Sequence, residues 1–180
     1  ISAFILEKGM AGFSAGAPYR KLGLHASNTA ELILHNVRVP AGNLLGEEGR
    51  GFVNTMQVLE GGRVAMAAMA VGLAQGALDQ ALRYMKQRSA FGQTLAEFNG
   101  LQGMIAEMGT EVEAARLLAL RAAALKDAGK PAKVAASMAK VFASEVAMKA
   151  ATKALQIHGG AGYITEFPIE RIFRDAKLTE

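Results

Sequence analysis

Apolar residues recur at helical spacing along the chain from residue 52 onward. Between Phe52 and about Arg88 they return every three or four positions, the period that places side chains on one face of an α-helix. The predicted face consists of Phe52, Met56, Leu59, Arg63, Met66, Ala70, Leu73 and Ala77. Four glycines interrupt this helix, and each lowers helix propensity by roughly 1 kcal/mol relative to alanine. We therefore expect the helix to be packed closely on several sides.

Two more helices follow with the same period. The apolar face of the second is Leu101, Ile105, Met108, Val112, Ala115 and Ala122, and this helix is expected to end near Gly129. Pro131 opens the third, whose predicted face is Val134, Met138, Val141, Met148 and Leu155. Because the connection between the two helices is short, we expect them to be antiparallel neighbours.

A fourth helix is predicted after the glycine-rich segment Gly159–Gly162. Thr165 is a candidate N-cap, and Pro168 suits the first helical turn, where its missing N–H is not needed. The residues predicted to share one face are Ile169, Ile172, Phe173 and Ala176. Four amphipathic helices with short connections predict an antiparallel four-helix bundle.

The first part of the chain has a strand-type pattern instead. Ile1–Leu6 and Tyr19–Leu24 are short apolar runs, and Thr29–Val39 alternates apolar residues until Pro40 ends it. The glycine-containing segments 7–18 and 41–51 are interpreted as a loop and a linker. The predicted fold class is α+β, with a β-type domain over residues 1–46 and a helical domain over residues 52–180.

Composition narrows the functional classes. The 180 residues are 51% hydrophobic and 20% charged, as in globular proteins. The net charge is +4, but Lys and Arg are scattered, which argues against nucleic-acid binding. The uncharged run Val64–Leu78 is shorter than the ~20 residues of a membrane span. Because cysteine is absent, there is no disulfide framework or thiolate metal site, and we expect a soluble intracellular protein.

Candidate binding chemistry begins where the first helix ends. An Arg88 guanidinium can bind phosphate oxygens through two hydrogen bonds, and a Phe91 ring can lie against an adenine. A solvated Arg88 beside a packed Phe91 is the alternative. Similarly, Gly159 and Gly160 either leave bare backbone that a ligand can approach or simply end a helix.

Charged residues on the predicted apolar face of the first helix form a second candidate site. Arg63 lies on that face, where an unpaired charge is costly, so it must be paired or face a ligand. An ion pair with Glu60, one turn earlier, or with a residue of another helix remains open beside ligand contact. The three histidines, His25, His35 and His158, lack metal-ligand spacing, so no metal site is predicted.

Three stretches of the chain together resemble the acyl-CoA dehydrogenase family, in the family's order. They are Gly23–Leu32 followed by Val37–Pro40, then Arg88–Gly92, and then Gln156–Gly162 with Tyr163, Arg174 and Asp175. The resemblance runs from Ile1 to Glu180. It implies the end of a β-barrel-like middle domain followed by most of a C-terminal helical domain, so we expect the sequence to be a C-terminal fragment.

The resemblance also implies which residues bind FAD and which border the acyl-CoA substrate. Arg88 corresponds to an arginine directed toward the FAD pyrophosphate of a neighbouring subunit, with Phe91 close by. Asn99 stands where the family has a longer glutamine. The stretch that corresponds to the second FAD-binding segment is Gln156, Ile157, His158, Gly159 and Gly160. The segment that borders the acyl-CoA site is Glu60, Gly61, Gly62 and Arg63, with room at Gly62 for the thioester.

The activity implied by the resemblance is flavin-dependent α,β-dehydrogenation of an acyl-CoA, with electrons passed to an electron-transferring flavoprotein, in a homotetramer. The family's base is a glutamate that would lie a few residues beyond Glu180, so no catalytic residue is assigned within this chain and the chain alone is expected to be inactive. Two other functions remain open: a non-catalytic assembly module of the same fold, and an acyl-CoA oxidase or flavin monooxygenase on the same scaffold.

Overall fold

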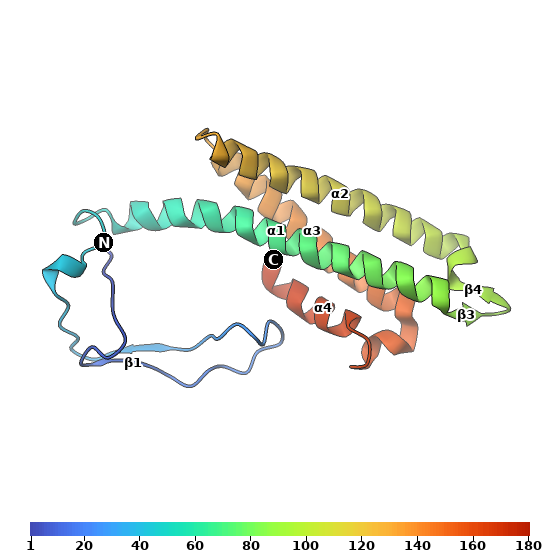
Figure 1. Ribbon diagram of the computed structural model, residues 1–180, viewed down its shortest axis with the longest axis horizontal. Coiled ribbons are helices and arrows are strands. Elements are labelled where there is room, and N and C mark those ends of the chain that lie inside the picture. The colour runs from blue at the N-terminus through green and yellow to red at the C-terminus, as the bar shows by residue number, and fades with distance from the viewer. The chain divides into compact units, whose positions relative to one another are not determined.

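The computed structural model describes residues 1–180 and is mainly helical (Figure 1). It divides into two compact units, Ile1–Leu59 and Glu60–Glu180, and we describe each by itself. The helices are α1 (Gly51–Gln87), α2 (Asn99–Asp127), α3 (Lys133–His158) and α4 (Ile169–Ala176), and the strands are β1 (Phe13–Ala15), β2 (Leu32–Leu34), β3 (Ser89–Ala90) and β4 (Gln93–Thr94). Short 3-10 turns cover Ala41–Asn43, Leu95–Glu97, Gly159–Tyr163 and Lys177–Thr179. None of the helices has the length and hydropathy needed to cross a membrane.

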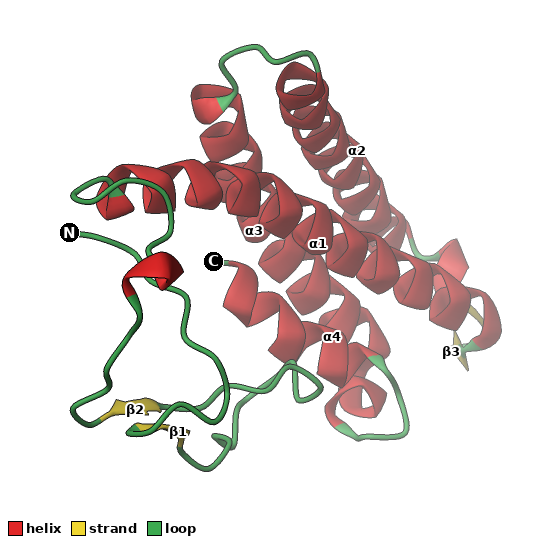
Figure 2. Ribbon diagram, turned by 60° about the vertical axis from the view of Figure 1, so that its left-hand side comes forward, coloured by secondary structure: helices red, strands yellow, loops and turns green.

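The first unit contains much less strand than its apolar runs predicted. β1 and β2 form a three-residue antiparallel ladder, in which Phe13 faces Leu34 (Figure 2). β1 lies in the segment that we expected to be a loop, while the predicted strand Tyr19–Leu24 does not form. The run Ile1–Leu6 contributes only one isolated bridge, from Phe4 to Leu44. Alternation marks residues able to pair, but a strand forms only where a second strand supplies the ladder.

The second unit confirms the predicted helical bundle. α2 and α3 run antiparallel, joined by the ion pairs Lys149–Glu111 and Lys153–Glu107. Between α1 and α2, the Arg116 guanidinium donates to Gln75 Oε1 at 2.6 Å. Residues 82–86 of α1 line a pocket with residues 102–106 of α2, and residues 68–79 line another with residues 116–120, so α1 and α2 are also antiparallel. α1 and α3 therefore point in the same direction.

Alanine dominates the buried face of the bundle. The predicted face of α2 is confirmed by Met108, Val112, Ala115 and Ala122, all of which are buried. The predicted face of α3 is only partly right: Met148 and Leu155 pack against the core, but Val134, Met138 and Val141 are 66%, 50% and 52% exposed. The buried residues of α3 are mainly alanines: Ala135, Ala136, Ala139, Ala143, Ala147, Ala150, Ala151 and Ala154. Small side chains let helix axes approach closely, which favours burying alanine over the larger residues beside it.

In α1, likewise, the large residues at the start of the predicted face are exposed. Phe52, Met56 and Leu59 belong to the first unit, where none of them is buried. Burial in α1 begins later, at Ala67, Ala70, Val71, Ala74, Ala77, Leu78, Ala81 and Met85. The bundle therefore packs on the C-terminal half of this helix.

The corner between α3 and α4 depends on glycine. Gly159 caps α3 with a φ of 59°, which favours glycine. A Cβ at Gly162 would lie 2.7 Å from the Leu155 carbonyl oxygen, so only glycine fits there without backbone movement. The N-cap prediction for Thr165 is wrong, because Pro168 is the N-cap of α4. Proline disfavours helical geometry in the residue before it, so α4 begins only after Phe167.

Candidate functional site

Segments distant in sequence meet at one end of the bundle. α1 ends just before Arg88, α2 begins at Asn99, and α3 ends at His158. Because α2 runs opposite to α1 and α3, these three points lie at the same end. Direct contact confirms this for α1 and α3: the rings of Tyr84 and His158 stack with centroids 4.2 Å apart and planes inclined by 22°. The two candidate cofactor segments, residues 88–92 and 156–160, are therefore close in space.

A tight hairpin carries Phe91 at the end of α1 (Figure 1). β3 and β4 pair through Ser89 with Thr94 and through Ala90 with Gln93. The two turn residues, Phe91 and Gly92, have φ of 53° and 83°, as in a type I′ turn. An aromatic residue is unusual in this left-handed conformation. The Phe91 side chain is also 96% exposed, so the alternative of a packed Phe91 is wrong for this chain.

Backbone contacts hold the hairpin firmly on the bundle. The Arg88 N–H donates to the Tyr84 carbonyl at 2.9 Å, and the Leu95 N–H donates to the Arg88 carbonyl at 2.8 Å. Glu97 accepts hydrogen bonds from the Thr94 N–H at 2.6 Å and from the Thr94 hydroxyl at 2.9 Å, which lower the pKa of Glu97. The Arg88 side chain is exposed and makes no ion pair, so its guanidinium is available to an anion.

The stretch 156–160 presents only some of its side chains outward. Gln156, Gly159 and Gly160 are exposed, whereas Ile157 and His158 are both 4% exposed. A Cβ placed on Gly159 or Gly160 would meet nothing within 4 Å, so the backbone there is open. Of the predicted cofactor residues in this stretch, Gln156 and the two glycines therefore face outward, whereas Ile157 and His158 face the core.

His158 is an internal packing residue. Its Nδ1 donates to the Ala154 carbonyl at 2.7 Å, and its ring lies edge-on to Phe167 with centroids 5.9 Å apart. Burial lowers the pKa of His158 and keeps the ring neutral near pH 7. Asn99, the other predicted amide, is the first residue of α2 and is exposed.

A groove of about 470 Å³ adjoins Gln156 between α3 and α4. Its other lining residues are Thr152, Leu155, Gly162, Tyr163, Glu170, Phe173 and Arg174. Arg174 Nε lies 2.7 Å from Glu170 Oε2, and this contact raises the pKa of Arg174. The groove thus combines an amide, an ion pair and aromatic rings, groups suited to a nucleotide.

The second candidate segment, residues 60–63, lies far along α1 from the hairpin. Arg63 and Tyr84 are separated by about 32 Å, taking 1.5 Å per helical residue. Arg63 is half-buried and forms no ion pair, so the alternative of an internal pair with Glu60 is wrong. A Cβ on Gly61 would lie 2.5 Å from Lys126 Nζ, whereas Gly62 has open space around it.

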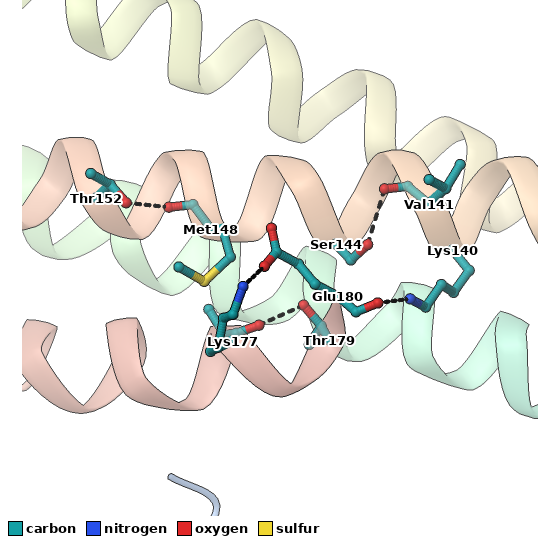
Figure 3. Close-up of polar contacts among 9 residues, drawn as sticks. Lys140, Val141, Ser144, Met148, Thr152, Lys177, Thr179 and Glu180 are labelled. Carbon is teal, nitrogen blue, oxygen red and sulfur yellow. Dashed lines mark hydrogen bonds and ion pairs between the residues drawn. The ribbon is translucent and has the colours of Figure 1, made fainter. Parts of the chain in front are cut away.

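The last turn of the chain is fixed against α3 (Figure 3). Lys140 Nζ donates to the Glu180 backbone carbonyl at 2.5 Å, and Lys177 forms an ion pair with the Glu180 carboxylate. Thr179 is fully buried, and its hydroxyl donates to the Ala176 carbonyl at 2.7 Å. The Glu180 carboxylate is therefore paired with a lysine.

No cluster of His, Asp and Glu is placed to hold a metal ion.

The chain is similar to known proteins in both sequence and structure. Residues 49–180 match the family described as "Acyl-CoA dehydrogenase, C-terminal domain". The short-chain-specific acyl-CoA dehydrogenase of Clostridium acetobutylicum is 50% identical over 180 residues, which are 100% of this chain and 48% of that protein. The chain thus spans about half the length of the curated relatives it matches.

Two solved structures are similar throughout the chain. Butyryl-CoA dehydrogenase from Megasphaera elsdenii has a TM-score of 0.97 and 49% identity, covering 99% of this chain and 46% of that chain. A structure reported for the electron transferring flavoprotein of Acidaminococcus fermentans contains a chain with a TM-score of 0.97 and 53% identity, covering 99% of this chain and 47% of that one.

Proposed function

Because the chain belongs to the acyl-CoA dehydrogenase family, we propose that the whole protein is a FAD-dependent enzyme that removes two hydrogens across the α,β-bond of an acyl-CoA. The observation that carries this proposal is the ring stack of Tyr84 on His158, which brings the hairpin 88–92 and the segment 156–160 to one end of the bundle. In this proposal, residues 52–180 are the helical domain, and residues 1–46 close the middle β-domain.

The outward groups at that end fit a dinucleotide. Arg88 would bind the pyrophosphate, because a guanidinium makes charge-assisted hydrogen bonds to phosphate oxygens. The exposed ring of Phe91 would lie beside it, while the Gln156 amide and the open backbone of Gly159 and Gly160 would contact the same molecule. Asn99 is a shorter amide at the same end of the bundle. FAD, when bound, supplies the acceptor for the hydride.

The shape of the site supports an oligomer in which FAD is shared between subunits. Phe91 combines a costly backbone conformation with an almost fully exposed ring, which is expected of a residue that completes its packing elsewhere. Arg63 lies about 32 Å along α1 from Tyr84, which itself precedes the hairpin, and this separation favours a different active site for the segment 60–63. We propose a homotetramer in which each bundle contributes to two sites.

The substrate would meet α1 near Gly62. The space around this residue leaves room for the thioester end of an acyl-CoA, and the unpaired, half-buried Arg63 supplies a positive charge beside it. Glu60 and Gly61 complete the segment. Similarity to short-chain-specific and butyryl-CoA enzymes makes a short acyl chain the first substrate to test.

Removing the α-proton requires a carboxylate with a raised pKa in a dry pocket. Glu180 does not suit this role, because Lys177 pairs with its carboxylate. Glu60 is two residues from Gly62 and points about 200° away from it on a helix. We therefore propose that the base lies beyond Glu180, in a segment whose start is held by the contact from Lys140. Electrons would pass to an electron-transferring flavoprotein.

Anaerobic titration of the full-length protein with butyryl-CoA tests this function. Loss of the oxidised flavin absorbance on mixing is the expected result, followed by its recovery when an electron-transferring flavoprotein is added. A protein that purifies without flavin and does not retain added FAD on gel filtration would support the assembly module. Stoichiometric peroxide on admission of oxygen would support the oxidase instead.

A further inference from the structure

Three aromatic rings meet where α1, α3 and the α3–α4 corner converge. Tyr84 stacks on His158, and Phe167 lies edge-on to both, with centroids 5.8 Å from Tyr84 and 5.9 Å from His158. Stacked and edge-to-face rings at these separations attract one another beyond the effect of burial alone. We call these three residues the aromatic clasp.

Each ring of the aromatic clasp is attached to a different part of the proposed FAD site. The Tyr84 carbonyl accepts the N–H of Arg88, so Tyr84 lies in the last helical turn before the hairpin. His158 directly precedes the open backbone of Gly159 and Gly160. Phe167 ends the turn that returns from this backbone toward α4.

The middle ring is fixed in orientation. The Nδ1 hydrogen bond of His158 to Ala154, one turn earlier on α3, prevents the ring from rotating. Tyr84 can therefore not shift along α3 without losing the stack. The side-chain hydrogen bond between α1 and α2, from Arg116 to Gln75, lies farther from the hairpin, whereas Met85 beside Tyr84 adds apolar packing against α2.

We propose that Tyr84 and Phe167 are positioning residues that act through the ring of His158. They hold the guanidinium of Arg88 and the backbone of Gly159–Gly160 at the spacing of one dinucleotide. This role rests on the proposed FAD site, and it adds two residues that do not touch the cofactor themselves.

Variants of the full-length enzyme test the role through the FAD dissociation constant, measured by flavin fluorescence on reconstituting the apoenzyme. Tyr84→Leu keeps an apolar side chain but removes the ring, and we expect affinity for FAD to fall about tenfold, the upper range for a lost aromatic pair. Tyr84→Phe keeps the ring and should bind FAD as the wild type does. Phe167→Leu provides a second test if Tyr84→Leu does not fold.

The matched control is Val112→Ala, which removes buried atoms from the middle of α2. It should lower the melting temperature at least as much as Tyr84→Leu while leaving FAD affinity unchanged. If Val112→Ala and Tyr84→Leu weaken FAD binding equally, or Tyr84→Phe weakens it as much as Tyr84→Leu, the positioning role is wrong.

A double-mutant cycle separates this inference from the proposed function. Arg88→Ala alone must weaken FAD binding; if it does not, the cofactor assignment itself fails. If it does, adding Tyr84→Leu to Arg88→Ala should reduce FAD affinity by clearly less than tenfold. Once Arg88 is absent, Tyr84→Leu can no longer weaken binding by misplacing it. If the loss of FAD affinity in the double mutant equals the product of the losses in the two single mutants, Tyr84 does not act through the hairpin and the positioning role is wrong.

Discussion

The backbone of Gly162 lies against the Leu155 carbonyl, so that a Cβ at Gly162 would approach this oxygen to 2.7 Å and the Cβ of His158 to 3.1 Å. Two residues earlier, Gly160 has nothing within 4 Å of such an atom. These two glycines of one short turn therefore differ: Gly162 is needed for packing, whereas the backbone of Gly160 is open.

Alanine substitution should affect Gly162 and Gly160 differently. Gly162→Ala should lower the free energy of unfolding by about 1–3 kcal/mol, because the nearest atom, the Leu155 carbonyl oxygen, belongs to the backbone and can move only if the helix distorts. Gly160→Ala should change stability by less than about 0.5 kcal/mol but weaken FAD binding, because the new methyl group occupies the open backbone face. Thermal unfolding and FAD titration of full-length variants measure both effects. Equal losses of stability would contradict the distinction.

Arg88→Ala should weaken retention of FAD by about ten- to a hundredfold, the range for losing a charge-assisted hydrogen bond to phosphate. The Michaelis constant for acyl-CoA should change much less, because the proposed substrate segment, residues 60–63, lies far from Arg88 along α1. The control is Arg121→Ala, another exposed arginine on the same bundle. Flavin content after gel filtration is the measurement, and unchanged content in Arg88→Ala would remove this residue from the site.

Gly62→Ala should separate stability from substrate binding. Alanine favours a helix over glycine by roughly 1 kcal/mol, and the position has free space, so the melting temperature should rise. If the thioester end of the substrate uses that space, the dissociation constant for acyl-CoA should rise as well, while FAD content stays constant. A variant that is more stable and binds acyl-CoA normally would show that the substrate does not approach Gly62.

Stability should depend on pH through His158. Burial lowers its pKa in the folded state below 6.5, the ordinary value, which an unfolded chain has. Below pH 6.5 the unfolded state binds a proton that the folded state does not, so the free energy of unfolding decreases as the pH falls toward the folded pKa. His158→Phe keeps an aromatic ring without a titrating group. Its melting temperature should fall less between pH 7.5 and 5.5 than that of the wild type, and an equal fall would contradict the assignment.

The sequence revealed the helices better than it revealed the buried faces. Spacing located all four helices, because each carries apolar residues at helical period. The same spacing favoured Val134, Met138 and Val141 over the alanines beside them, since large apolar residues dominate any hydrophobicity pattern. Which face is buried depends on how closely neighbouring helices approach, and this is a property of the packed bundle.

The site was only partly visible in the sequence. The motif residues Arg88 and Gln156 could be identified, but their placement at one end of the bundle depends on helix directions and on the stack of Tyr84 with His158. Tyr84 and Phe167 belong to no motif and were missed. The inward orientation of His158 could not be predicted either, because the sequence His-Gly-Gly does not indicate whether the histidine faces a ligand or the core.

The most direct test of this account is a structure of the full-length protein with FAD bound. We predict that one subunit places Arg88 and Gln156 against the same FAD molecule, whose flavin ring lies on a neighbouring subunit. The distance from the Arg88 guanidinium to the nearest pyrophosphate oxygen should be within hydrogen-bond range, about 2.7–3.2 Å. FAD bound entirely within one subunit, or away from Arg88 and Gln156, would contradict the central claim.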